Sequence, residues 1–134
     1  MRDEVYVLNL CDGVLHSPSE RQHRFAFLLG DTGRKLPVDA YYPRLALVIE
    51  YHERQHSEAV PFFDRRLTVS GVPRGLQRAI YDQRRRDVLP QHGIQLVEFS
   101  VKEFARQGRR LRRREVEDIE VIRQKLEHYI RHVG

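Results

Sequence analysis

The stretch that decides the fold is residues 35–56, which read KLPVDAYYPRLALVIEYHERQH. In its first part, apolar residues such as Val38 and Ala40 alternate with residues such as Asp39. Alternation with period two is typical of a strand that buries one face. We therefore expect a strand over residues 35–42, with Asp39 on the face opposite Val38.

A turn containing Pro43 separates that strand from a continuous apolar run, residues 45–49, which leads directly into Glu50. Such a run suits a strand buried on both faces at the centre of a sheet. The two strands then form a hairpin-like pair, which brings Asp39 and Glu50 together at one edge of the sheet. Two carboxylates suit Mg²⁺, which prefers oxygen ligands and keeps several waters. The alternative is that Glu50 merely ends a buried strand at the surface.

The flanking sequence predicts further elements on both sides of this pair. Ser17 and Pro18 supply a cap and an early proline, and Glu20 a first-turn acid, so we expect a first helix over residues 17–29. The other expected elements are a turn at 31–34, a helix opening at 72–74, a strand at 93–99, a short capped turn at 100–103 and a last helix from residue 115.

Charge and composition point to a polyanionic partner. The 134 residues suit a single domain, and Lys+Arg number 24 against 19 acids, with lysine only at three positions. Arginine pairs bidentately with phosphate, which favours nucleic acid, although a coding bias toward arginine would give the same composition. The only cysteine, Cys11, allows no internal disulfide and fits a reducing cytoplasm. Nothing in the sequence predicts a signal peptide or a membrane span.

The arginines gather in two segments. Arg74, Arg78 and Arg85 share one side of the expected second helix, and residues 106–114 form the densest cluster. In that cluster we expect Arg109, Arg110 and Arg113 to contact nucleic acid; pairing with the acids that follow is the alternative. The last helix carries an apolar stripe, which serves either as core or as a homodimer contact. Its members are Ile119, Ile122, Leu126, Tyr129 and Val133.

The motif PVDAYYP at residues 37–43, followed by LALVIE at 45–50 and Gln55-His56, resembles the core of the PD-(D/E)XK nuclease superfamily. The nearest branch is the short nucleases related to very-short-patch repair endonucleases. The resemblance covers about residues 17–104 and leaves a basic segment and helix at 105–134.

The resemblance implies a restriction-endonuclease-like α/β fold, with a mixed central sheet flanked by helices. It also implies metal-dependent hydrolysis of phosphodiester bonds, with DNA the first expectation. Asp39 and Glu50 would ligate Mg²⁺ or Mn²⁺, and Glu20 would match the acid on the family's first helix. His52 stands where the superfamily has Lys and this branch Asp, and His56 matches the downstream histidine.

Two other functions stay open. The first is a nucleic-acid-binding module on the same fold whose catalysis has lapsed, because His52 and Glu53 replace family residues. The second is a histidine-metal enzyme that would use His16, His23, His52 and His56, whose spacing does not fit a helical H-E-x-x-H pair. Metal-dependent cleavage of nucleic acid separates the nuclease from both.

Overall fold

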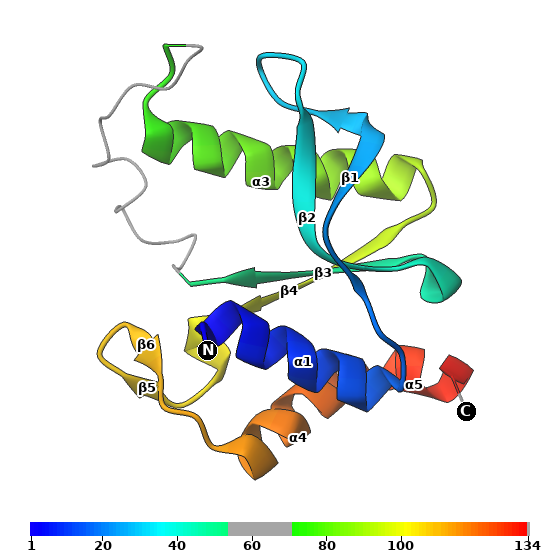
Figure 1. Ribbon diagram of the computed structural model, residues 1–134, viewed down its shortest axis with the longest axis vertical. Coiled ribbons are helices and arrows are strands. Elements are labelled where there is room, and N and C mark those ends of the chain that lie inside the picture. The colour runs from blue at the N-terminus through cyan, green and yellow to red at the C-terminus, as the bar shows by residue number, and fades with distance from the viewer. Residues whose placement is uncertain (54–70, 134) are drawn as a thin grey trace.

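The computed structural model describes residues 1–53 and 71–133, with side chains described as far as residue 130. It is a mixed α/β structure, as the sequence predicts, built on a four-stranded sheet of order β1-β2-β3-β4 (Figure 1). The strands β1 (Glu20–Leu29), β2 (Lys35–Tyr42) and β3 (Leu47–His52) run antiparallel in succession, and β4 (Gln95–Ser100) joins β3 in parallel. This parallel pair makes the sheet mixed.

Helices cover both faces of the sheet (Figure 1). On one face, α1 (Asp3–Leu15) and α4 (Glu115–Lys125) pack around a core that includes α1 residues such as Leu8 and the buried Ile122 of α4. On the other face, α3 (Arg74–Gln91) contributes Leu89 to a second core. The short helix α5 (Glu127–Val133) follows α4 at the C-terminal end.

β3 lies between β2 and β4, and it is buried on both faces, as its apolar run predicts. Leu47, Ile49 and Tyr51 belong to the core beneath α1, and Val48 belongs to the core beneath α3. Because side chains alternate along a strand, Glu50 falls on the α3 side between these apolar residues. Glu50 of the central strand is therefore buried in the interior.

The helix expected over residues 17–29 is wrong, because this segment forms the turn after α1 and then strand β1. His16 adopts a left-handed conformation with φ 51° and ends α1, and the backbone NH of Ser17 donates to Asp12 O. The polar residues after His16, which resemble the start of a helix, therefore follow the end of α1. The earlier helix was visible in the spacing of apolar α1 residues, namely Val7, Leu8, Cys11, Val14 and Leu15.

The later elements agree with the prediction, with one exception. The helix after Pro73 is α3, the next strand is β4, and a capping box between Ser100 and Glu103 opens a short 3-10 turn (Val101–Glu103). The expected last helix is divided into α4 and α5 at Leu126. A small hairpin of β5 (Arg106–Gln107) and β6 (Arg110–Leu111) precedes α4.

The apolar stripe of the last helix is core. Ile122 and Leu126 are fully buried, and Ile119 and Tyr129 pack against the same cluster. These four residues are therefore engaged within the chain rather than offered to a second copy. In the described part of the chain, no helix is both long and apolar enough to cross a bilayer.

Candidate active site

Asp39 and Glu50 face each other across β2 and β3, where the backbone ladder between the two strands ends. The last paired residues are Ala40 and Ile49, so the next pair outward is Asp39 and Glu50. There the side chains replace the ladder: the Asp39 NH donates to Glu50 Oε2 at 2.5 Å, and the Tyr51 NH donates to Asp39 Oδ2 at 2.8 Å. Each carboxylate is thus fixed by the backbone of the opposite strand.

Glu50 is an unusual carboxylate, because only 4% of the residue is exposed. Burial, and next the charge of Asp39, raise the pKa of Glu50 well above its usual value. Arg85 of α3 acts in the opposite direction, with its Nε 3.4 Å from Glu50 Oε1. The site therefore concentrates negative charge that one guanidinium only partly compensates.

Asp39 is tied to the N-terminal helix through Gln22 of β1. The Gln22 side-chain amide donates to Asp39 Oδ1 at 3.3 Å and to Glu4 Oε2 at 3.5 Å. Gln22 adopts a left-handed conformation with φ 52°, which is uncommon for a residue other than glycine and is often found at functional sites. Burial and the charge of Asp39 also raise the pKa of Glu4.

Glu4 is not among the predicted site residues, because the sequence did not predict the helix that carries it. Glu20, the acid predicted for the first helix, lies instead on β1 and is exposed. Its Oε2 is 3.1 Å from His23 Nδ1, so its nearest partner is a histidine of its own strand. Since no third acid closes with Asp39 and Glu50 into a metal-binding group among the described residues, the role predicted for Glu20 is not supported by its position.

His52 is turned toward β4 and α3. Its Nε2 lies 2.8 Å from Glu98 Oε1, and Arg86 donates to both oxygens of Glu98 at 2.8 and 2.9 Å. Burial alone would raise the pKa of Glu98, but the hydrogen bonds from His52 and Arg86 outweigh it and lower this pKa to about 2. The described neighbours of His52 therefore place it in an ion-pair network beside the acid pair.

His56, the downstream histidine that the resemblance implies, lies outside the described residues.

The arginines of α3 divide into two kinds. Arg74 is exposed at the start of the helix, and Arg78 is half-buried. Arg85 points inward with 13% of its side chain exposed, and it donates to the carbonyl oxygen of Pro37 and to Asp82. Because its guanidinium contacts Pro37, Asp82 and Glu50, the position of Arg85 does not support the nucleic-acid contact that helical spacing predicts.

Two hollows lie beside the acid pair at the N-terminal end of α1. The first, of about 350 Å³, is lined by Arg2, Glu4, Val5, Arg21, Gln22 and Asp39. The second, of about 520 Å³, is lined by Met1, Arg2, Asp3, Glu53, Arg109, Arg110 and Arg113. Arg2 borders both, so the arginines predicted from the basic segment stand next to the hollow that contains Asp39. Arg113 is also bound to Asp3 at 3.0 Å and lies over the Tyr6 ring.

The donor set fits a hard divalent cation in composition. Within residues 1–53 and 71–133, no group of three or more His, Cys, Asp or Glu side chains is placed to hold a metal ion. Asp39 and Glu50 supply two carboxylates, and Mg²⁺ is commonly held by one or two carboxylates together with waters and substrate phosphates. Burial and then the charge of Asp39 raise the pKa of Glu50, so an added cation would relieve the repulsion between the two acids.

Comparisons with protein-family models, with curated proteins and with solved structures give no match for this chain.

Proposed function

We propose that this chain is a metal-dependent nuclease that hydrolyses phosphodiester bonds, with Asp39 and Glu50 as its metal ligands. The observation that carries the proposal is the pair of facing carboxylates at the open end of the β2–β3 ladder, held by each other's backbone. A preorganised acid in the interior whose pKa burial raises, as it does for Glu50, is characteristic of functional sites. The restriction-endonuclease-like fold is part of the same proposal, supported by the mixed sheet with helices on both faces.

A divalent cation held by the two acids would polarise a phosphodiester and lower the pKa of water. Neighbouring residues of the chain would hold the two carboxylates in position. The backbone NH groups of Asp39 and Tyr51 orient the carboxylates, and Gln22 fixes the remaining Asp39 oxygen. Arg85 keeps a fixed positive charge against Glu50, on the side of α3.

Glu4 takes the place that the resemblance gives to an acid on the first helix. The first helix is α1, and Gln22 links its Glu4 to Asp39. We assign Glu4 a positioning role, in which it orients water or Gln22 beside Asp39. The arginines around the adjacent hollows supply the positive surface that a phosphate backbone requires.

The lapsed binding module remains the second candidate, and specific contacts favour it. Glu50 already has an internal cation in Arg85, and His52 lies within hydrogen-bond distance of Glu98. Such a protein would bind nucleic acid through the same arginines without cutting it.

The experiment incubates the purified protein with plasmid, linear duplex, branched and single-stranded DNA, and RNA of matched sequence. Each substrate is tested with Mg²⁺, Mn²⁺, Ca²⁺ or chelator. We expect cleavage of at least one substrate with Mg²⁺ or Mn²⁺, and none with chelator. Binding without cleavage in every metal would contradict the nuclease and support the binding module.

A further inference from the structure

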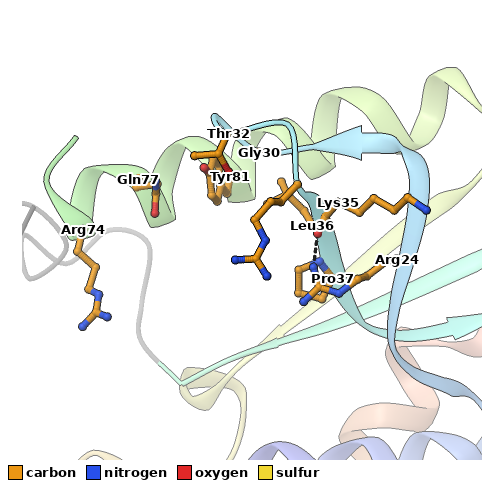
Figure 2. A pocket seen from close by; sticks show the side chains of 10 residues that line it. Arg24, Gly30, Thr32, Lys35, Leu36, Pro37, Arg74, Gln77 and Tyr81 are labelled. Atoms are coloured by element: carbon orange, nitrogen blue, oxygen red, sulfur yellow. Dashed lines mark hydrogen bonds between the residues drawn. The ribbon is translucent and has the colours of Figure 1, made fainter. Parts of the chain in front are cut away.

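A third hollow, on the other side of Asp39 along β2, is lined by four cationic side chains, three from the β1–β2 hairpin and one from α3. Its volume is about 720 Å³, and its described lining is Arg24, Gly30, Thr32, Arg34, Lys35, Leu36, Pro37, Arg74, Gln77 and Tyr81. None of these ten residues is acidic. Figure 2 shows Arg74 entering from α3, while Arg24 and Lys35 belong to the β1–β2 hairpin. We name this hollow the hairpin pocket.

The hairpin pocket is fixed in shape by contacts between the hairpin and α3. The Asp31 NH donates to the Tyr81 hydroxyl at 2.8 Å, and Arg84 of α3 donates to the carbonyl oxygen of Leu29 at 2.8 Å. Gly30 packs closely there, since a Cβ at this position would lie 2.9 Å from the Tyr81 hydroxyl oxygen. The hairpin is therefore docked on α3, the helix that carries Arg74.

No acid is among the described residues that line the pocket. Asp31 does not line the pocket, and its Oδ1 lies 3.5 Å from Arg84. Arg24 is held by the carbonyl oxygen of Lys35, which accepts a hydrogen bond from it and leaves its positive charge uncompensated by that contact (Figure 2). Four like charges that line one hollow favour a polyanionic ligand.

The position of the pocket along β2 connects it with the acid pair. Lys35 stands four residues before Asp39 on the same strand, which corresponds to about 13 Å at the usual rise of a strand. Each strand of a DNA duplex advances about 3.4 Å along the axis per nucleotide, so the same distance spans about four nucleotides. Arg85 joins the two sites, because it contacts both Pro37 of the pocket lining and Glu50.

We infer that the hairpin pocket binds the phosphate backbone of the substrate about four nucleotides from the bond that is cut. The inference rests on the proposed function for the place of that bond. With the arginine-lined hollows near α1 on the opposite side of Asp39, the substrate backbone is gripped on both sides of the acids.

The test compares two variants that lose the same charges in different places. The pocket variant, Arg34→Gln/Lys35→Gln, removes two of the four cations that line the hairpin pocket. The control variant, Arg44→Gln/Lys102→Gln, removes one arginine and one lysine from exposed positions outside this pocket. Affinity for a fluorescent DNA duplex is measured by anisotropy in chelator, over a range of salt concentrations. Circular dichroism and thermal melting show that both variants fold like the wild type.

We expect the pocket variant to bind DNA about tenfold or more weakly near physiological salt. The slope of log affinity against log salt concentration should also become shallower, by about two released counterions. The control variant should remain close to the wild type. Equal affinities for pocket and control variants would overturn the inference, while cleavage by the wild type would leave the nuclease intact. Conversely, loss of affinity in the pocket variant with no cleavage by the wild type would support the pocket and contradict the nuclease.

A second experiment tests whether the pocket binds a phosphate backbone or a single phosphate group. Inorganic phosphate is added as competitor at constant ionic strength, against the wild type and the pocket variant. We expect the duplex to stay bound, since one phosphate reaches only part of the pocket. Displacement of the duplex from the wild type alone would overturn the assignment to a backbone.

Discussion

Glu50 and Glu98 are partners in the parallel ladder between β3 and β4, yet their surroundings affect them in opposite ways. Each is approached by an arginine of α3: Arg85 lies beside Glu50, and the next residue, Arg86, binds Glu98. The pKa of Glu98 falls to about 2, whereas the pKa of Glu50 rises well above its usual value.

The difference comes from the deeper burial of Glu50 and from the second neighbour of each glutamate. Glu98 has His52 on one oxygen and a bidentate arginine, and a quarter of its side chain, 27%, is exposed. Glu50 has Asp39 as its second charged neighbour and is buried. A carboxylate that is hydrogen-bonded by an arginine and a histidine is complete within the protein, while a buried carboxylate beside another acid is completed by an added cation. The comparison therefore predicts that Glu50 is functional and Glu98 structural.

The largest effect is expected when a proposed metal ligand is changed. Asp39→Asn or Glu50→Gln should reduce metal-dependent cleavage by about a thousandfold or more, since a metal ion contributes several kcal/mol of charge stabilisation to hydrolysis. Cleavage rates at saturating metal and DNA measure this, and binding in chelator should change little. Glu20→Gln is the matched control, because Glu20 is an exposed acid of the same sheet and should retain full activity. Unchanged cleavage by both ligand variants would remove the acid pair from the mechanism.

The acid pair was predictable because its signals are local. The alternation in residues 35–42 and the apolar run before Glu50 are both visible in the sequence, and β2 is observed at the predicted residues. Antiparallel pairing of two neighbouring strands then brings Asp39 opposite Glu50 without knowledge of the rest of the fold.

The surroundings of the pair were not predictable in the same way. Glu4 and Gln22 reach Asp39 from segments whose secondary structure was misjudged, because capping residues at the end of one helix look like the start of another. Arg85 has the helical spacing of a surface residue, and only the packing of α3 on the sheet turns it inward. Likewise, the pairing of His52 with Glu98 depends on the parallel register of two strands far apart in sequence.

The next effect concerns stability, and it should differ in sign between the two glutamates. The folded pKa of Glu98 is about 2 against 4.5 for a free side chain, so its ionised form stabilises the fold above pH 4.5 and this contribution is lost as the pH falls toward 2. Glu98→Gln should therefore lower the free energy of unfolding at neutral pH by about 2 kcal/mol, after allowance for partial exposure. Urea unfolding at several pH values measures the loss, which should shrink in acid.

Glu50→Gln should behave in the opposite way. Its folded pKa is raised, so ionised Glu50 destabilises the fold increasingly as the pH rises from 4.5 through that pKa. The variant should gain stability relative to the wild type over that interval, and the wild type alone should be stabilised by added Mg²⁺. A wild type that is more stable than Glu50→Gln at neutral pH without metal would show that Arg85 already neutralises the site.

The smallest effect is expected at His52, which stands where the nuclease superfamily that the sequence resembles carries lysine or, in one branch, aspartate. Because its Nε2 lies 2.8 Å from Glu98, we assign it a positioning role through the Glu98–Arg86 ion pair rather than metal ligation. His52→Ala should lower the cleavage rate by about tenfold, below the hundredfold or more expected of a general acid or base. His52→Gln keeps a hydrogen-bond donor toward Glu98 and should restore most of the rate.

The ratio of rates in Mn²⁺ and Mg²⁺ should be the same in the wild type and in both His52 variants, because imidazole favours the softer ion only when it is a ligand. A loss of Mn²⁺ preference in both variants, or a hundredfold loss that glutamine does not rescue, would instead place His52 in the chemistry itself.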